Sequence, residues 1–444
     1  MLTQNAEKLE KTLFRLTAGS VARLNIGIGK QPEGGYGKEM PQTCFMNAQT
    51  PMNHRSKASP EAQDVVGIVD ELLQRAVAAG ASDIHFEPTG SDLKVKYRLD
   101  GVLNLIESLP AAVADNMIAR LKVLGGLLTY RNDVPQEGRL ELSGSPSDKV
   151  TDVRLAVFPT IHGQRAVVRL FYRNEELLSL EHLGFAPRIE SLLKTIAVQN
   201  QGVLLVTGPA GSGKSTTLAA LLRHIIETLP GKSIVTLEDP VEIRIEGVTQ
   251  VPITPHGQMT FPTALRSLLR QDPQVLMIGE IRDAETARIA IEAGLTGHLL
   301  MSTMHSGSPA GALLRLLEMG VEPYQVTSSI SAVVNQRLVR RLCEKCRKQG
   351  DDGPFEPVGC ESCFGTGFHG RILIAEIVRL DGDLRKAILA KADLDELEAL
   401  LKAKGHTTIL ADGNRLVEAG VTTRAELQKA CGIALDQGTC GREP

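Results

Sequence analysis

The 444-residue sequence contains no tryptophan, and its aromatic side chains are limited to 5 Tyr and 10 Phe. Aromatic rings are the usual stacking platforms for single-stranded nucleic acid, so their scarcity disfavours that class of protein. A strong charge of either sign is also missing, because 49 basic and 52 acidic residues leave a formal charge of −3. The sequence therefore offers no global cationic field of the kind that attracts nucleic acid.

Long hydrophobic runs are missing as well. No apolar stretch approaches the roughly 18 residues that a membrane-spanning helix requires. The N-terminal segment MLTQNAEKLEKTLFRL mixes acids and bases and lacks the apolar centre of a secretory signal. Contents of 42% hydrophobic and 23% charged residues argue against wholesale disorder. We therefore expect a cytoplasmic protein, and its length suggests about three domains.

The first 57 residues differ from the rest in carrying eight Lys or Arg against four Asp or Glu. We predict a short helix near residues 6–18, followed by a stretch rich in Gly, Pro, Asn and Gln that shows no period. We favour a solvated linker over a docking segment for this basic lead, and both interpretations stay open.

An α+β domain is predicted for residues 58–172. Apolar spacing between Ser59 and Gly80 indicates an amphipathic helix, and a second helix is expected over residues 111–128. Strands are predicted from the alternating segments SDIHFEP, LKVKYRLDGVL, RLELSG, TDVRLAVFP and QRAVVRLFY. A connector over residues 173–187 then leads to the next domain.

Residues 188–341 alternate apolar strand runs (VLLVTG, SIVTLEDP, QVLMIGE, HLLMSTMH) with helical patterns. This order is typical of βαβ units, so we predict an α/β fold with a mainly parallel sheet covered by helices. The remainder is divided into a cysteine-bearing module, residues 342–375, and a helical region, residues 376–444. From about Leu342 we expect no long strands.

The segment GPAGSGKS at residues 208–215 fits the pattern GxxxxGK[ST] and lies directly between a predicted strand and a predicted helix. In that context the glycines let backbone N–H groups surround phosphates, and the helix N-terminus favours their negative charge. We predict that Lys214 reaches the β- and γ-phosphates of ATP or GTP and that Ser215 holds Mg²⁺. The expected nucleotide-binding residues are Gly208, Pro209, Ala210, Gly211, Ser212, Gly213, Lys214, Ser215 and Thr216.

Acidic residues follow two neighbouring strands of the same domain. Glu238 and Asp239 come after SIVTL, and Glu280 comes after VLMIG. Carboxylates at the C-terminal ends of parallel strands face the crevice in which ligands bind, so we favour a catalytic role over surface acids or helix caps. His298 and His305 flank the strand LLMSTM, and the residues alone leave catalytic and structural roles equally open.

Four of the seven cysteines form two CxxC pairs, Cys343/Cys346 and Cys360/Cys363, separated by 13 residues. Two such pairs can close a tetrahedral four-thiolate Zn²⁺ site with no open position, which makes the site structural. Four free thiols or a redox pair are the alternatives. The remaining Cys44, Cys431 and Cys440 have no partner spacing, and we interpret them as ordinary thiols.

The ordered motifs GPAGSGKST, TLEDPVE, LRQDPQVLMIGEIRD and GHLLMSTMHS resemble the Walker A, Asp-box, Walker B and His-box of the secretion ATPases of type II secretion and type IV pilus assembly. The likeness covers roughly residues 60–428, including ASDIHFEP and RLDGVL upstream and GRILIAE downstream. It implies a homo-hexameric ring of RecA-like P-loop motors that hydrolyse ATP, each preceded by a PAS-like α+β domain.

The resemblance also implies roles for individual residues. Glu280 matches the Walker B acid that organises Mg²⁺ or its water, and Glu238 matches its Asp-box partner. Arg154 and Arg169 match arginines that reach the nucleotide phosphates from the N-terminal domain. Without the family, both arginines read equally well as polar positions of alternating strands. The resemblance also makes His298 and His305 expected contributors.

Two positions depart from the family pattern. Gln164 replaces a glutamate after the strand that carries Arg154, which removes a charge near the arginine pair. Gly307 replaces the usual asparagine after the His-box, so we expect a missing local hydrogen bond. The nucleotide-binding signature is intact, and we expect activity.

The tetracysteine module is typical of assembly and export members rather than retraction members, so the leading hypothesis is a peripheral inner-membrane ATPase that drives pilus extension or pseudopilus-driven export. Its expected partner is the platform protein of the secretion or pilus machine, with ATP, Mg²⁺ and Zn²⁺ as ligands and no direct nucleic acid. The alternatives are a RecA-like nucleic-acid motor and a nucleotide-gated interaction subunit with little turnover.

Overall fold

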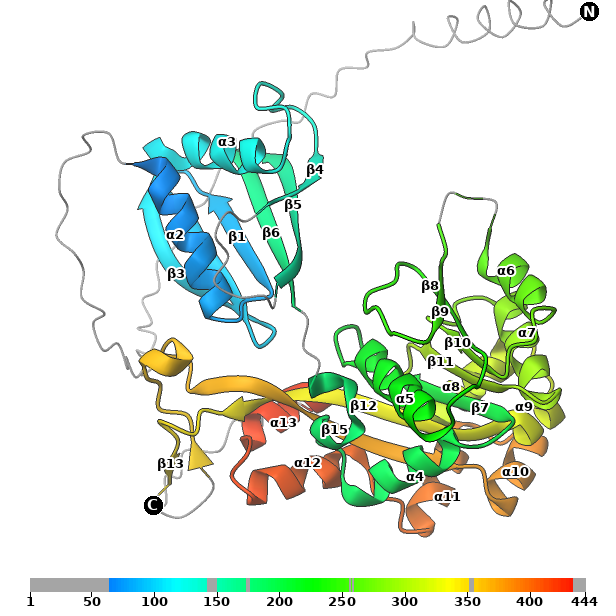
Figure 1. Cartoon of the computed structure of the whole chain (residues 1–444). Helices are drawn as coiled ribbons and strands as arrows, with labels where there is room; N and C mark the ends of the chain where they lie inside the picture. Colours follow the sequence, from blue (N-terminus) through cyan, green and yellow to red (C-terminus); the bar gives the residue numbers. More distant parts are fainter. Residues whose placement is uncertain are drawn as a thin grey trace, which may run out of the picture. The chain divides into compact units, whose positions relative to one another are not determined.

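A computed structural model describes residues 64–141, 150–172, 176–254, 257, 259–350 and 355–433. The predicted helix near residues 6–18, the second half of RLELSG (residues 142–144), Cys44 and Cys440 lie outside these residues. The described chain builds two main sheets, of which the six-stranded one comes first along the sequence and the seven-stranded one follows it (Figure 1).

The first sheet has six strands in the order β3-β2-β1-β6-β5-β4, and every neighbouring pair is antiparallel. Its core lies on one face, where apolar residues of alternate strand positions pack against the helices α2 and α3, while charged residues occupy the open face. The elements are α2 Val65–Ala78, β1 Asp83–Pro88, β2 Asp92–Leu99, β3 Val102–Pro110, α3 Ala114–Leu124, β4 Gln136–Arg139, β5 Val150–Thr160 and β6 Gly163–Tyr172.

The segment LKVKYRLDGVL, predicted as one strand pattern, is a hairpin. Asp100 and Gly101 both have positive φ values, 48° and 88°, and they separate β2 from β3. Asp-Gly is the sequence that two-residue hairpin turns of this backbone conformation prefer. The sequence therefore contains the turn signal Asp-Gly. The alternating pattern continues on both sides of it, so the segment reads as one strand pattern.

The second sheet has seven strands in the order β15-β12-β7-β11-β10-β8-β9. Six of them run parallel, and only the edge strand β15 is antiparallel. The strands are β7 Gly202–Thr207, β8 Ile234–Glu238, β9 Thr249–Pro252, β10 Val275–Ile278, β11 Leu299–Met304, β12 Ile330–Leu342 and β15 Phe368–Arg379. Helix α4 Pro187–Ala197 precedes these strands, and the helices between them are α5 Lys214–Thr228, α6 Phe261–Leu268, α7 Ala284–Leu295, α8 Pro309–Glu318 and α9 Pro323–Ser329.

Helices cover both faces of the parallel sheet (Figure 1). Along β7, Val203 and Leu205 join a core with α6 to α9, whereas Leu204 and Val206 join a core with α4 and α5. Burial on both faces explains why these strands read as continuous apolar runs rather than alternating ones. The predicted mixed α/β fold with a mainly parallel sheet is confirmed.

The prediction that no long strand follows residue 342 is wrong. Strand β15 has 12 residues and pairs with β12 along most of its length, so the chain returns to the sheet after the cysteine segment. Its sequence FHGRILIAEIVR is half buried and rich in isoleucine, which favours a strand. The expected helices follow as α10 Gly382–Leu389, α11 Leu394–Ala403, α12 Ile409–Glu418 and α13 Arg424–Cys431. Within the described residues, none of the helices combines the length and apolar character needed to span a bilayer.

Candidate nucleotide and metal sites

The loop between β7 and α5 has the backbone that its glycines allow. Gly208, Gly211 and Gly213 have φ values of 141°, 73° and 87°, in the region that residues with a Cβ rarely adopt. At Gly208 a Cβ atom would lie 2.3 Å from the carbonyl oxygen of Gln336, so space also excludes a side chain there. The loop therefore depends on glycine at these positions.

Lys214 is the first residue of α5 and turns back over this loop. Its Nζ donates hydrogen bonds to the carbonyl oxygens of Gly208 and Pro209, at 2.9 and 3.0 Å. Burial lowers the pKa of Lys214, and the negative charge of Glu280 partly opposes this shift. The ammonium group is thus held at the mouth of the loop, within the electrostatic influence of an acidic residue from another strand.

Gln336 on β12 holds the phosphate loop in place through its side chain. This residue was not predicted from the sequence. Its fully buried side chain donates from Nε2 to the carbonyl oxygen of Ser212 at 2.9 Å and accepts from the hydroxyl of Thr217 at 3.0 Å. One side chain therefore ties β12 to both the phosphate loop and α5. The signal was the polar pair Asn335-Gln336 inside the apolar run AVVNQRLV, since buried polar residues need partners.

A cavity of about 240 Å³ opens beside the loop, at the carboxyl ends of the parallel strands. Part of the predicted phosphate-binding set lines it together with the predicted acids, and these residues come from the phosphate loop, from α5 and from the ends of β8, β10 and β11. Those of the predicted residues that line the cavity are Ala210, Lys214, Ser215, Glu238, Asp239, Glu280 and His305.

Glu280 lies between two cationic or ionisable side chains. Its Oε2 accepts a hydrogen bond from Arg282 Nε at 2.8 Å, and its Oε1 lies 3.1 Å from His305 Nε2. Arg282 also lines the cavity and was not singled out in the sequence, although it stands in the quoted motif GEIRD. The Glu280 side chain is 17% exposed, so it faces the cavity rather than bulk water.

Glu238, at the end of β8, is oriented by polar neighbours. Its Oε1 accepts hydrogen bonds from the Thr236 hydroxyl at 2.6 Å and from Gln250 Nε2 at 3.0 Å. Gln250 also donates to the carbonyl oxygen of Ile243 and accepts from the N–H of Ile245, which anchors it. The two acids are therefore held separately, each by its own set of partners, around one cavity.

The two histidines of the His-box segment are not brought together. His305 follows β11 at the cavity, whereas His298 precedes β11 and lies at the opposite end of that strand. The ring Nδ1 of His298 lies 3.1 Å from the carbonyl oxygen of Ala293 at the end of α7. Within this chain, His298 therefore has the contacts of a structural residue.

Arg154 and Arg169 lie on neighbouring strands of the antiparallel sheet, directly opposite each other. Arg154 Nε donates to Asp152 at 3.1 Å and its guanidinium lies 4.7 Å from the centre of the Phe171 ring. Arg169 Nε donates to Asp83 at 2.8 Å. Each arginine of the predicted pair is thus held by one aspartate.

The structure shows the contacts of Gln164 and Gly307, the two residues that depart from the family pattern. Gln164 donates from Nε2 to Asn132 at 2.7 Å, and its Oε1 is buried without a partner among the described residues. The carbonyl oxygen of Gly307 accepts from Asn335 at 3.0 Å, and a Cβ on Gly307 would meet nothing within 4 Å. The loop after His305 is therefore fixed by its backbone and has room for a side chain.

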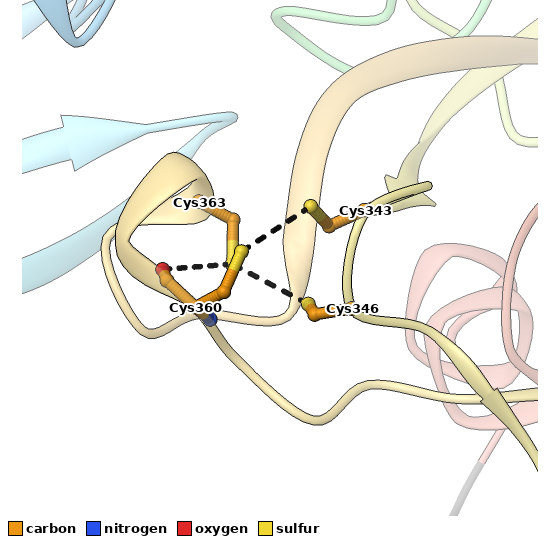
Figure 2. Close-up of side chains that lie close together, drawn as sticks. All are labelled: Cys343, Cys346, Cys360 and Cys363. Carbon is orange, nitrogen blue, oxygen red and sulfur yellow. Dashed lines mark hydrogen bonds between the residues drawn. The ribbon is translucent and has the colours of Figure 1, made fainter.

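The four CxxC cysteines converge on one point (Figure 2). All four sulfur atoms lie within 4.8 Å of one another, and three of the separations are 3.9 Å (Cys343–Cys360), 3.8 Å (Cys346–Cys363) and 3.7 Å (Cys360–Cys363). A tetrahedral metal with sulfur ligands at about 2.3 Å has edges of about 3.8 Å. The donor set therefore fits a closed tetrahedral metal site.

Backbone donors favour the thiolate form of Cys363, the form in which a cysteine binds metal. Burial alone would raise the pKa of Cys363, but its Sγ accepts from the N–H groups of Cys360 and Gly367, both at 3.2 Å, and the pKa falls to about 7. Such N–H groups around a sulfur fix the orientation of a metal ligand. Cys431, on α13, does not belong to this cluster.

A phosphate loop between β7 and α5, with two strand-end acids across one cavity of a parallel sheet, defines a P-loop nucleotide hydrolase. The family model described as Type II/IV secretion system protein matches residues 59–429. The chain belongs to this family. The predictions of the family and of an ATP-hydrolysing enzyme are confirmed.

The chain is also similar to named proteins of type IV pilus assembly and type II secretion. The type IV pilus assembly ATPase PilB of Thermus thermophilus is 39% identical over 377 residues, which cover 81% of this chain and 42% of that protein. The type II secretion system protein HxcR of Pseudomonas aeruginosa is 40% identical over 365 residues, covering 82% and 76%. The type II secretion system ATPase E of Vibrio cholerae is 37% identical over 397 residues, covering 86% and 78%.

Solved structures agree on the fold. The ATPase DotB of Legionella pneumophila superimposes with a TM-score of 0.61 at 22% identity, covering 84% of this chain and 97% of that one. The pilus retraction motor PilT with bound ADP gives 0.55 at 22% identity, covering 81% and 96%. At 22% identity the similarity shows that the helices and strands are arranged in the same way, and it shows the fold alone.

Proposed function

We propose that the chain is a Mg²⁺-dependent ATPase whose homo-hexameric ring powers pilus extension or pseudopilus-driven protein export at the inner membrane. The observation that carries this proposal is the single cavity in which Lys214, Ser215, Glu238 and Glu280 meet. Phosphoryl transfer needs positioned donors and compensating charge rather than covalent catalysis, and these residues supply both.

Each residue has a role that follows from its position. The N–H groups of the loop and Lys214 bind the phosphates of ATP, while the hydroxyl of Ser215 and the nearby carboxylates offer the oxygen ligands that Mg²⁺ prefers. Mg²⁺, when bound, neutralises charge on the β- and γ-phosphates. Glu280 or Glu238 accepts the proton of the attacking water, and His305 orients Glu280 through its contact at 3.1 Å.

Arg154 and Arg169 complete the proposed site from the N-terminal sheet of a neighbouring copy. Arginines that stabilise developing phosphate charge contribute about 10³–10⁵ in rate in other phosphoryl-transfer enzymes. The exposed guanidinium groups and the family likeness support this role. We assign no direct role in ATP hydrolysis to His298, because it lies at the far end of β11 from the cavity.

The cysteine cluster is proposed to bind Zn²⁺, because a partly buried set of four thiolates suits that ion. Its place between β12 and β15 gives the ion a structural task, namely to order an excursion from the sheet. We further propose the platform protein of a pilus or type II secretion machine as partner, with peripheral attachment to the inner membrane. We propose no nucleic-acid substrate for either site.

The experiment measures steady-state phosphate release from ATP by the purified full chain, with Lys214→Ala as the test variant. We expect turnover in the wild type, loss of at least 100-fold in Lys214→Ala, and no change in the control Lys232→Ala, whose ammonium bonds Asn200 outside the cavity. Mass determination in solution should give six copies with ATP present. Turnover that needs single-stranded DNA, or none at all, would contradict the proposal.

A further inference from the structure

Two neighbouring amide side chains on β12 lie on opposite faces of the parallel sheet. Asn335 and Gln336 are both fully buried, and successive side chains of a strand point to opposite faces. Their apolar neighbours divide in the same way, because Val333 packs in the core with α6 to α9 and Val334 packs in the core with α4 and α5. Gln336 bonds the phosphate loop and α5 on one face. Asn335 therefore faces the other one, where β11 continues into α8.

Asn335 binds the segment that joins β11 to α8, residues 305–308, which we call the His305 loop. Its Nδ2 donates a hydrogen bond to the carbonyl oxygen of Gly307 at 3.0 Å. Among the described residues, Asn335 and Arg337 are the only side chains from outside this loop that donate to its backbone, and Arg337 does so at the longer distance of 3.4 Å. The main chain of the His305 loop therefore depends chiefly on Asn335.

Glu376 determines which end of the Asn335 amide faces the loop. It lies on β15 directly opposite Asn335, and its Oε1 accepts a hydrogen bond from Asn335 Nδ2 at 2.8 Å. Its Oε2 accepts from the N–H of Ile409 at 3.2 Å and lies 3.3 Å from His406 Nε2. The Gly307 carbonyl and the Glu376 carboxylate are both acceptors, so only the NH₂ end of the amide can face them.

This orientation leaves the other end of the amide without a partner. Asn335 Oδ1 is buried and accepts no hydrogen bond among the described residues. Buried polar atoms of this kind are rare and costly in folded proteins, and a small apolar residue at this position would avoid the cost. Such local costs occur mainly at functional sites. The value of Asn335 therefore lies in its donor end, which joins the His305 loop to Glu376.

The His305 loop sets the position of a residue at the cavity. His305 Nε2 lies 3.1 Å from Glu280 Oε1, but the His305 side chain is 49% exposed, so few neighbours constrain it. Its place depends on the backbone on either side. Met304, which precedes it, is held by pairing with β7, and Gly307, which follows two residues later, is held by Asn335. The contact with Glu280 therefore requires both anchors.

We propose that Asn335 is a positioning residue of ATP hydrolysis, which holds the His305 loop so that His305 meets Glu280. Glu376 orients the Asn335 amide for this task. Asn335 does not line the cavity and touches no substrate. This inference rests on the proposed function, in which Glu280 and His305 serve the chemical step, and deepens it. With Gln336 on the phosphate loop and Asn335 on the His305 loop, β12 positions both sides of one site.

The first test separates kcat from ATP binding in the full chain. Asn335→Ala removes the donor, so kcat should fall about 10- to 100-fold, because small misplacements are costly in catalysis. The dissociation constant for ATP should change less than threefold, since Asn335 bonds the His305 loop and Glu376 rather than the phosphate loop. Asn335→Val also lacks a donor, suits a buried strand and should show the same split. Ser331→Ala is the matched control: this residue of β12 donates to Gln199 outside the cavity, and its kcat should stay within twofold of the wild type.

A double-mutant cycle identifies the residue through which Asn335 acts. In a His305→Ala background, Asn335→Ala should lower kcat by less than twofold. The positioning role is overturned if Asn335→Ala and Asn335→Val alone keep kcat within twofold of the wild type. It is also overturned if Asn335→Ala causes the same fold-loss in the His305→Ala background, since that result would mean a general structural effect. Loss of ATP binding in proportion to kcat would overturn it too.

Hydrogen exchange followed by mass spectrometry keeps this inference distinct from the proposed function. The N–H groups of Gly311 and Ala312 bond Ser308 at 3.2 and 3.1 Å, so their exchange reports whether the His305 loop keeps its conformation. In the full-length Asn335→Ala variant, exchange should be at least fivefold faster in peptides that contain these two residues and unchanged in peptides of the phosphate loop. Unchanged exchange in the first set, or faster exchange in both sets, would overturn the inference. If the wild type lacked ATP turnover, the proposed function would fail while this comparison still decided whether Asn335 holds the loop.

Discussion

His305 Nε2 lies 3.1 Å from Glu280 Oε1, and this contact joins the residue that follows β11 to the acid that follows β10. The two strands are neighbours in the parallel sheet, so their ends deliver both side chains to the same cavity. Arg282 occupies the other carboxylate oxygen of Glu280. The acid is therefore oriented on both sides before any nucleotide is present.

Replacing His305 should affect the chemical step more than nucleotide binding. We expect His305→Ala to lower kcat about 10- to 100-fold, since misplacement of a catalytic group by 1 Å can cost 10² in rate. ATP affinity should change less than threefold, because the histidine does not belong to the phosphate loop. Stopped-flow ATP binding and steady-state turnover measure the two quantities.

His224→Ala is the control for this variant, because His224 lies on α5 near Thr228 and outside the cavity. It should leave kcat unchanged. An equal loss in both variants, or a loss confined to ATP binding in His305→Ala, would contradict the orientation of Glu280 by His305.

Gln336 should control the shape of the phosphate loop from outside the cavity. In Gln336→Met the Ser212 carbonyl and the Thr217 hydroxyl lose their buried partner, which costs about 1–3 kcal/mol of unfolding free energy. We also expect KM for ATP to rise, because the loop is less well ordered. Chemical denaturation and steady-state kinetics test this, and unchanged stability together with unchanged KM would contradict it.

The ion pair between Arg340 and Glu426 should make stability depend on pH. Arg340 on β12 donates from Nε to Glu426 on α13 at 2.8 Å, and its guanidinium lies 3.9 Å from the centre of the Phe368 ring. Burial would raise the pKa of Glu426, but the hydrogen bond and charge of Arg340 lower it below its ordinary 4.5. A lowered pKa contributes stability above pH 4.5 that is lost as pH falls through the folded-state pKa.

Glu426→Gln should therefore reduce the unfolding free energy by about 1–3 kcal/mol at pH 7, and the difference from the wild type should shrink as pH falls below 4.5. Denaturant titrations between pH 3.5 and 7.5 measure it. The control Glu227→Gln removes an exposed i,i+4 pair with Arg223 and should cost at most about 0.5 kcal/mol. A difference that grows as pH falls would refute the assigned direction.

The cysteine cluster should bind one metal ion per chain and support local folding. Cys363→Ser removes a buried ligand, so bound zinc should fall from one equivalent to near zero and the thermal midpoint should drop, since apparent binding energies of about 10–16 kcal/mol accompany such sites. Cys431→Ser, outside the cluster, is the matched control and should keep its zinc. Elemental analysis and calorimetry provide the measurement; equal zinc in both variants would argue against the site.

The phosphate loop could be predicted from sequence because its chemistry is local. Glycine spacing, the lysine and the flanking strand and helix all lie within about two dozen residues, and the positive φ values of Gly208, Gly211 and Gly213 follow from that pattern. The acids at 238 and 280 were predictable for a related reason, since Glu238 ends one buried strand of the parallel sheet and Glu280 lies just beyond the end of another.

Other parts depend on long-range pairing that the sequence does not display. Strand β15 is completed by β12, from which the cysteine segment separates it, and Arg154 meets Arg169 only once β5 and β6 adopt their register. The role of Gln336 likewise depends on its hydrogen bonds with Ser212 and Thr217, which lie more than a hundred residues away in the sequence. Sequence periodicity indicates which residues face outward but not which of them meet.

The most direct test of the account is ATP turnover by Glu280→Gln. Glutamine keeps the size of the side chain and one oxygen that can accept a hydrogen bond from Arg282, but it cannot accept a proton or carry the charge that organises Mg²⁺. We predict that the variant binds ATP with an affinity close to that of the wild type and that kcat falls at least 100-fold. Turnover by Glu280→Gln at the wild-type rate would contradict the central claim that this cavity hydrolyses ATP.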